Sequence, residues 1–280
     1  MRSVFSLVFL VFGTIASAVA QEAALQYPLA VVADPDGVIY VADLELPGVW
    51  KVTDGKAEVY FQASKRFRTP LNRVRCLAID GDGRLLAGDS ATREVYRFSE
   101  DGKPEPLTNG YIGIPSAIVT AEDGTIYVAD LEVERVWSFP KDGLKESEEP
   151  TEVAVVAGVR GLAFDADKKL LLVTTIEDPI RRVGDDGKLE VLVPGRPFEF
   201  PHQIVVGKDG SYLVTDNYAA TVWQVPAGGG EPKPFMKGEP LVKPVGLGKR
   251  GDDLLVADPH AKAIFVITPD AKVTTLVKAK

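Results

Sequence analysis

The apolar positions of this chain fall into short runs, each closed by an acidic or hydroxyl residue, and the runs return at a nearly fixed interval. The runs close at Asp43, Asp89, Asp130, Thr174, Asp216 and Asp258, with spacings of 46, 41, 44, 42 and 42 residues. Short runs of β-branched and aromatic residues between turn residues are typical of β-strands. A period of this length predicts a repeat architecture, and the interval suits one blade of a β-propeller.

The unit around Asp130 shows the internal order of one repeat. Four strands are predicted in it, at residues 117–119, 125–129, 135–139 and 152–156. Asp-Gly pairs at 123–124 and 142–143 separate successive strands, and such pairs favour tight hairpin turns because the glycine accepts a positive φ. A four-stranded antiparallel sheet repeated radially forms a propeller. The sequence therefore predicts an all-β, six-bladed β-propeller of four-stranded antiparallel blades.

Two other architectures fit the pattern less well. After residue 20, no window sustains the i, i+3, i+4, i+7 apolar spacing of an amphipathic helix for more than about two turns. An open solenoid is the alternative repeat arrangement, but its terminal repeats should be atypical caps. The first and last repeats here have the ordinary pattern, so we expect a closed ring.

The first twenty residues have the features of a signal peptide rather than of the fold. Arg2 precedes an apolar run over residues 4–15, and Ala18-Val19-Ala20 has the small-x-small form of a cleavage site. We expect cleavage near Ala20 and a periplasmic or extracellular location. Residues 21–280 are predicted to form a single propeller domain, with blades at approximately 27–66, 67–112, 113–157, 158–198, 199–240 and 241–280.

The formal net charge of −8 and the single cysteine, Cys76, exclude several possibilities. A net negative chain disfavours nucleic acid and anionic membranes as partners. One cysteine cannot form an intrachain disulfide, so stability must come from the apolar core. We expect no membrane insertion after cleavage, and we expect a monomer.

Residues that recur in nearly every repeat are predicted to serve the framework. In five repeats the third strand carries an aromatic residue at the same position: Trp50, Tyr96, Trp137, Trp223 and Phe265. In blade four this position is Arg181. A side chain repeated in this way is expected to pack between neighbouring blades. The strand-ending Asp is expected to accept backbone N–H groups of the following turn, as Asp does in local turn motifs. Catalysis needs a unique constellation, which a repeated residue does not provide.

The segment 124–137, GTIYVADLEVERVW, closely resembles the NHL repeat, and Arg135-Val136 stands where that family usually has Arg-Val. The resemblance covers all six repeats and is weakest in blade four. The segment beginning Pro201-His202, with Asp209-Gly210 after it, is also similar to the gluconolactonase and senescence-marker-protein family of six-bladed propellers. The first resemblance implies a binding surface, and the second implies a metal-dependent hydrolase.

The two resemblances make different predictions for residues at the channel mouth, the end of the channel where the first strand of each blade begins. Counting back 14 residues from each strand-ending residue gives Pro244 for blade six, or Val245 because of a one-residue irregularity. For the other blades it gives Leu29, Arg75, Ser116, Arg160 and His202. The gluconolactonase-like resemblance implies acidic and amide ligands of a divalent metal in this region. None of these positions holds an acid or an amide.

The residues that stand there instead predict an anion site. Two guanidiniums, a hydroxyl and an imidazole attract an anion, and Arg binds carboxylate or phosphate through two parallel hydrogen bonds. The loop before blade two adds Lys65, Arg66, Arg68 and Arg73. The alternative is structural: Arg75 and Arg160 pair with acids such as Glu199, or cover the channel wall with their stems.

The two histidines receive different weight. His202 is one of the six channel-mouth positions, which we call the mouth column, and is able to titrate near neutral pH. His260 lies in a loop between strands and has no partner at a zinc-binding spacing. Only His202 is retained as a candidate.

We therefore predict an exported NHL-like binding propeller whose channel mouth holds an anionic small molecule or an acidic segment of a protein partner. The ligand-binding candidates are Arg75, Ser116, Arg160 and His202, with no metal and no cofactor. Secondary candidates are Arg73, Asn72, Glu199 and Asn217. The alternative is a gluconolactonase-like lactone hydrolase or lyase, in which calcium or another divalent metal would be bound by Asn72, Glu199, Asn217 or Asp216. A third hypothesis is a structural scaffold.

Overall fold

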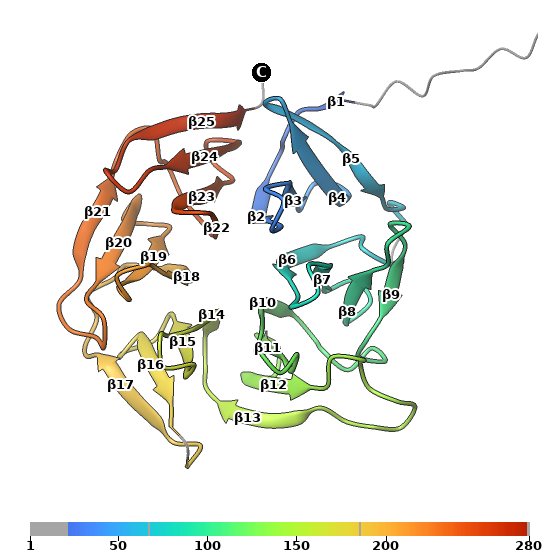
Figure 1. The fold of residues 1–280 in the computed structure, drawn as a ribbon, viewed down its shortest axis with the longest axis horizontal. Helices are drawn as coiled ribbons and strands as arrows, with labels where there is room; N and C mark the ends of the chain where they lie inside the picture. Colours follow the sequence, from blue (N-terminus) through green and yellow to red (C-terminus); the bar gives the residue numbers. More distant parts are fainter. Residues whose placement is uncertain (1–21, 67, 185, 279–280) are drawn as a thin grey trace, which may run out of the picture.

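The computed structural model describes residues 22–66, 68–184 and 186–278, which form six antiparallel sheets arranged in a ring. Figure 1 shows the sheets as blades around a central opening, with the first strand of each blade nearest the centre. The predicted six-bladed β-propeller is confirmed. The predicted signal peptide, residues 1–20, lies outside the described residues.

Within each blade the strands follow one another outward from the centre, and blade one has an additional strand at its outer edge. Blade one contains β1 (Glu22–Ala23), β2 (Pro28–Ala33), β3 (Ile39–Asp43), β4 (Leu46–Thr53) and β5 (Lys56–Gln62). Blade two contains β6 (Val74–Ile79), β7 (Leu85–Asp89), β8 (Glu94–Phe98) and β9 (Pro104–Pro106). Blade three contains β10 (Pro115–Thr120), β11 (Ile126–Asp130), β12 (Arg135–Phe139) and β13 (Thr151–Val155).

The other three blades repeat this order. Blade four contains β14 (Val159–Phe164), β15 (Leu170–Thr174), β16 (Ile180–Val183) and β17 (Leu189–Val193). Blade five contains β18 (Pro201–Val206), β19 (Tyr212–Asp216), β20 (Thr221–Val225) and β21 (Lys233–Lys237). Blade six contains β22 (Gly246–Arg250), β23 (Asp253–Asp258), β24 (Ala263–Ile267) and β25 (Val273–Lys278). In the described part of the chain, no helical segment has the length and apolarity that a membrane span requires.

The Asp that ends the second strand fastens each blade to the segment that leads into it. The fully buried carboxylate of Asp130 accepts the backbone N–H groups of Gly113 at 2.8 Å, Ile114 at 2.9 Å and Glu132 at 3.0 Å. Asp43, Asp89, Asp216 and Asp258 accept equivalent bonds. The bond to the following turn agrees with the sequence prediction. The bonds to the preceding segment are an addition, and that segment leads to the channel mouth.

Blade four departs from this arrangement. The Thr174 hydroxyl is fully buried and forms no hydrogen bond to any described residue. Asp178, four residues later, accepts the N–H of Gly195 at 2.7 Å instead. Arg181, which replaces the repeated aromatic, donates to the carbonyl of Glu177 at 2.7 Å. In blade four, Asp178 and Arg181 thus form local hydrogen bonds in place of the contacts that the repeated Asp and aromatic residue make in the other blades.

Apolar side chains fill the interfaces between blades, and the repeated aromatics lie in these interfaces. Trp50 of blade one packs in one cluster with Leu255 and Ile264 of blade six. Strand β25 pairs only within blade six, and β1 pairs with β5 of blade one. The ring therefore closes through packing of blade six on blade one, without exchange of a strand between them.

The first strand of five blades carries a register shift close to its start. In blade two, Val74 pairs with Asp89 and Cys76 pairs with Gly88, so Arg75 is an extra residue between the two pairs. Equivalent shifts occur in blades one, three, four and five. Such β-bulges redirect a side chain and are frequent next to functional sites. In these five blades, the bulge coincides with the residue that the sequence predicts at the channel mouth.

Candidate functional site

The bulges place the predicted column at one end of the central channel. Gln203, which follows His202, donates from its side-chain amide to the carbonyl of Ser116 at 2.9 Å and to that of Arg160 at 3.1 Å. These bonds bring blades three, four and five together at the mouth. In blade six, Gly246 pairs with Ala257, and Val245 therefore takes the position equivalent to Arg75. Of the two alternatives for that blade, the structure supports Val245 over Pro244.

Arg75 is half-buried and belongs to a small hydrogen-bonded group in blade two. Its Nε donates to Ser90 Oγ at 3.0 Å, and Ser90 donates from its backbone to the carbonyl of Arg73. Burial and the charge of Arg73 lower the pKa of Arg75, while Asp89 acts in the opposite direction. The guanidinium nevertheless stays charged, because Arg is not deprotonated in proteins. Arg75 is thus a positioned cation with unused N–H donors.

Arg160 approaches the same mouth from blade four. Its guanidinium carbon lies 5.4 Å from the ring centre of Phe200, which is a cation–π geometry. Its Nε is buried and forms no hydrogen bond within the described part of the chain. Burial, and then the charge of Arg75, lower the pKa of Arg160. The two guanidiniums therefore lie close enough to repel one another.

Carboxylates do not neutralise this pair. Among the described residues, neither Arg75 nor Arg160 forms an ion pair with an acidic side chain. The Glu199 side chain, the acid named in the structural alternative, is exposed, and Glu132 pairs with Arg93 at 2.6 Å. The mouth thus retains two half-buried positive charges that form no ion pair with a described acidic side chain.

The structure corrects the prediction that His202 titrates near neutral pH. Burial, and then the charge of Arg160, lower the pKa of His202 to about 3. Its ring contacts Phe200 edge-on, with the ring centres 5.2 Å apart. His202 is therefore neutral at physiological pH and offers the mouth a hydrogen bond, not a charge. His260 is exposed and lies with its ring centre 6.1 Å from that of Tyr27.

The hydroxyl of Ser116 is largely occupied by the protein. Its Oγ lies 3.0 Å from the carbonyl oxygen of Val159 and 3.3 Å from that of Ala129. A hydroxyl carries a single proton, so it donates to one carbonyl at a time and keeps its lone pairs free. Ser116 thus offers an acceptor to the mouth and is a weaker anion ligand than either arginine.

The secondary candidates divide into separate groups. Arg73 is exposed and lies near enough to Arg75 to influence its pKa. Asn72 donates from its side chain to the carbonyl of Ser64 at 2.6 Å, in the loop before blade two. Asn217 is buried, and its backbone N–H donates to the carbonyl of Phe200. Only Arg73 adds charge to the two arginines of the mouth.

A column of two stacked aromatic rings with a cation at each end flanks the mouth and was not predicted from the sequence. Phe200 and Tyr218 are stacked with ring centres 5.0 Å apart at an angle of 29°. Arg160 lies against Phe200, and the Lys243 ammonium lies 5.4 Å from the ring centre of Tyr218. The column fixes the guanidinium of Arg160 at one end and presents Lys243 at the other.

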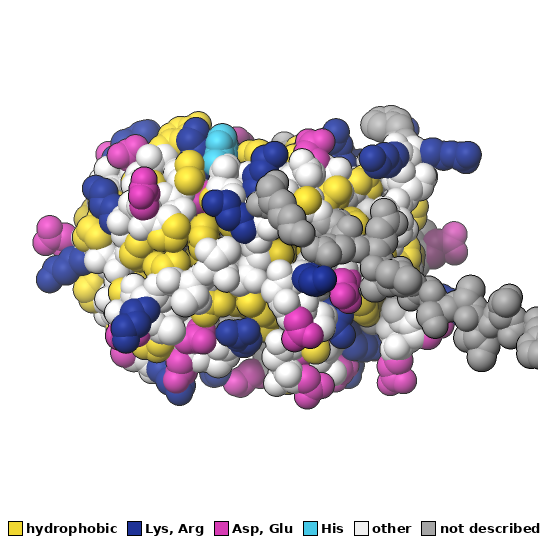
Figure 2. All heavy atoms as spheres, turned by 90° about the horizontal axis from the view of Figure 1, so that it is seen from above, with side chains coloured by type: hydrophobic (Ala, Val, Ile, Leu, Met, Phe, Trp, Pro, Cys, Tyr) yellow, Lys and Arg dark blue, Asp and Glu magenta, His cyan; other side chains and the backbone are white. Residues whose placement is uncertain are grey.

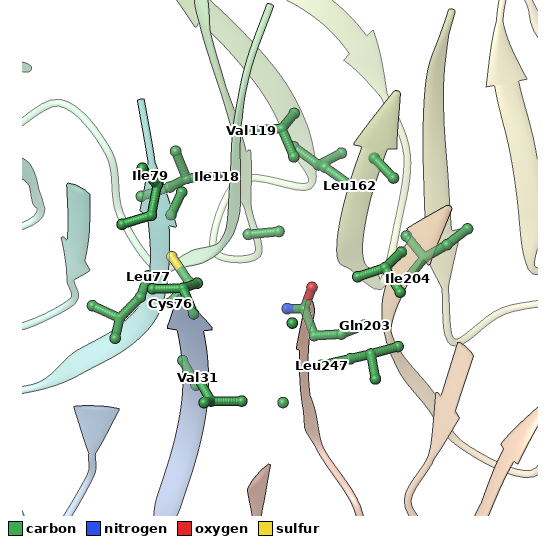
Figure 3. Close-up of a pocket in the computed structure, with 18 of the residues that line it drawn as sticks. Val31, Cys76, Leu77, Ile79, Ile118, Val119, Leu162, Gln203, Ile204 and Leu247 are labelled. Atoms are coloured by element: carbon green, nitrogen blue, oxygen red, sulfur yellow. The ribbon is translucent and has the colours of Figure 1, made fainter. Parts of the chain in front are cut away.

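Beneath the mouth lies the central channel, with a volume of about 370 Å³. Residues from the first strands of all six blades line it, and most of them are aliphatic or glycine. Figure 3 shows the side chain of Gln203 pointing into the channel, whereas Cys76 lies in the wall near Val31 and Ile118 with its thiol directed to the carbonyl of Pro115. Burial raises the pKa of the Cys76 thiol to about 12. The site is therefore a cationic mouth above an apolar channel.

The low pKa of His202 predicts a measurable pH dependence of stability. Between pH 6.5 and about 3, the unfolded chain binds a proton on this residue that the folded chain does not. Its contribution to stability is complete above pH 6.5 and is lost as the pH falls toward 3. Between pH 7 and 4, wild type should lose about 3 kcal/mol more free energy of unfolding than His202→Gln. Urea denaturation at several pH values measures this difference.

His260→Gln is the matched control for that experiment, because the His260 side chain is exposed. It should follow the wild-type pH profile. If His202→Gln also follows the wild-type profile, His202 is not held neutral in the folded protein.

Comparison with known proteins gives the following similarities. No protein-family model matches the chain. It is 27% identical over 224 residues to peptidyl-glycine alpha-amidating monooxygenase B of Xenopus laevis, a match covering 68% of this chain and 25% of that protein. The chain thus spans about a quarter of the length of this curated relative.

Two solved structures show the range of proteins with the same architecture. A gluconolactonase from Xanthomonas campestris superposes with a TM-score of 0.72 at 16% identity, over 90% of this chain and 87% of that one. A chain of a nidogen–laminin complex superposes with a TM-score of 0.68 at 18% identity, over 89% and 92% of the two chains. At the level of the fold, the resemblance found in the sequence is confirmed: the chain is a six-bladed β-propeller of the kind found in gluconolactonase-like and NHL-like proteins.

Proposed function

We propose that this chain is a binding protein whose channel mouth holds the anionic group of a small molecule or of an acidic segment of a partner protein. The observation that carries the proposal is the pair Arg75 and Arg160, half-buried and without a carboxylate partner among the described residues. Arg73 extends the same positive region outward.

The energetics of the pair favour an anion between the two guanidiniums. Burial disfavours the charged forms of both arginines, and a neighbouring guanidinium adds to this effect: Arg73 for Arg75, and Arg75 for Arg160. A bound carboxylate or phosphate offsets both costs and accepts hydrogen bonds from the free guanidinium N–H groups. On the side of the ring that Figure 2 shows, basic and acidic side chains are interspersed, without a broad patch of one sign. The mouth is therefore the best-supported anion site.

The proposal also covers the location and the oligomeric state of the protein. The predicted leader and cleavage near Ala20 would deliver a monomeric propeller to the periplasm or the extracellular space, without membrane insertion. The net charge of −8 disfavours nucleic acid as the ligand.

Calorimetric titration with acetate, phosphate and sulfate at low ionic strength tests the proposal. The double variant Arg75→Ala, Arg160→Ala should weaken binding by about 150-fold or more, because each arginine contributes a hydrogen bond to a charged group of about 1.5–3 kcal/mol. Arg93→Ala is the matched control, because Arg93 is exposed and already paired with Glu132. It should change the affinity by less than about twofold. Unchanged binding by the double variant would contradict the proposal.

The similarity to gluconolactonase keeps a second candidate, lactone hydrolysis or a lyase reaction, under test. The residues suggested for a divalent metal do not fit one. Both oxygens of Asp216 accept backbone N–H groups, from Glu199 and Phe200. Within the described ranges, no group of three or more His, Cys, Asp or Glu side chains is arranged to hold a metal ion. Lactone hydrolysis that is lost on chelation would favour the hydrolase over the binding protein.

A further inference from the structure

The channel beneath the mouth has the properties of a site for a hydrocarbon chain. Of the described side chains that line it, only Cys76, Thr120 and Gln203 are polar or sulfur-bearing. The thiol is directed to the carbonyl of Pro115 at 3.5 Å, and the Gln203 amide is bonded to two carbonyls of the wall. A sugar or another hydroxyl-rich ligand would find few side-chain hydrogen-bond partners here.

The channel begins at the residues that directly follow the mouth column on the first strands. Five of these six residues are small, and four of the five line the channel: Ala30, Cys76, Ala117 and Gly246, the fifth being Gly161. The sixth is Gln203, whose amide is held by the carbonyls of Ser116 and Arg160, two mouth residues. The channel therefore starts within one or two residues of Arg75 and Arg160 along their strands, and its walls are aliphatic further down (Figure 3).

We propose that the ligand is an amphiphilic anion, such as a straight-chain carboxylate, with its head group at Arg75 and Arg160 and its hydrocarbon chain in the channel. This inference rests on the proposed function, because it uses the same pair of arginines. The positive mouth complements the head group, and the channel of about 370 Å³ accommodates the chain. Each methylene transferred from water to such a site contributes about 0.8 kcal/mol, which corresponds to about a fourfold gain in affinity.

Titration of the intact protein with acetate, butanoate, hexanoate, octanoate and decanoate, each below its micelle concentration, tests the inference. The affinity should rise by about three- to fourfold for each added methylene and level off once the channel is full. Octan-1-ol, which has the chain without the charge, should bind at least about tenfold more weakly than octanoate.

The outcomes separate this inference from the proposed function. If acetate and decanoate bind equally well and both depend on Arg75 and Arg160, the mouth binds anions and the channel inference is wrong. If no carboxylate binds, both are wrong. If octan-1-ol binds as tightly as octanoate, the channel takes apolar molecules but the amphiphilic anion is excluded.

Two valine variants test whether the hydrocarbon chain of the ligand lies in the channel. Val119 lines the channel and is partly exposed within it, so Val119→Phe should make the affinity level off at a shorter chain than in wild type. Val155→Phe on the outer strand β13, where the valine is 59% exposed, is the control and should reproduce the wild-type series. If the carboxylate affinities of Val119→Phe equal those of wild type, the hydrocarbon chain of the ligand lies outside the channel.

Discussion

Replacing Asp130 with alanine is expected to lower the free energy of unfolding by about 4 kcal/mol, because three backbone N–H groups lose their acceptor at once. Two of them, on Gly113 and Ile114, belong to the segment that leads into β10. The site of the carboxylate is fully buried, so water cannot replace it without a rearrangement of blade three. Guanidinium denaturation followed by circular dichroism measures the loss.

Blade four supplies the control for this prediction. Thr174 holds the position equivalent to Asp130, and its hydroxyl forms no hydrogen bond to any described residue. Thr174→Val retains the shape and removes a buried polar group, so it should be neutral or should stabilise by about 1 kcal/mol. A loss below about 1 kcal/mol in Asp130→Ala would show that the repeated carboxylate does not fasten the blade.

The repeat made the fold and the position of the mouth predictable. Five second strands end in an Asp, so the copies could be aligned and the residue 14 positions earlier could be found in each. That position coincides with the bulge of β6 at Arg75 and of β14 at Arg160. A bulge adds one residue in the same place in each of these blades, so it does not disturb the count. Only blade six, which lacks the shift, left its register undecided between Pro244 and Val245.

The environment of the mouth was less predictable, because it depends on contacts between positions that do not repeat. Phe200, Tyr218 and Lys243 come from three different segments, and the sequence shows no periodic signal that joins them. The low pKa of His202 arises from burial and from Arg160 on another blade. Neither the burial nor the nearby charge can be read from the residues next to His202 in the sequence. The sequence alone therefore suggested an ordinary histidine pKa.

Shared architecture does not decide between binding and catalysis for this chain. A gluconolactonase and a chain of a nidogen–laminin complex both superpose on it, although their names describe an enzyme and a protein assembly. Function in such folds depends on the site and not on the scaffold. The unpaired arginines above an apolar channel are therefore the features to test first.

Closure of the ring leads to the second large prediction, at Gly248 in β22. A Cβ at this position would lie 2.4 Å from the carbonyl oxygen of Val31 in β2, so Gly248→Ala must push blade six away from blade one. In a closed ring the displacement spreads to the other blades, and we expect a loss of about 3 kcal/mol in the free energy of unfolding, measured by urea denaturation. Gly81→Ala, where nothing lies within 4 Å of the added atom, should stay within about 0.5 kcal/mol of wild type. Equal stability of the two variants would mean that blades one and six are not held in this close contact in solution.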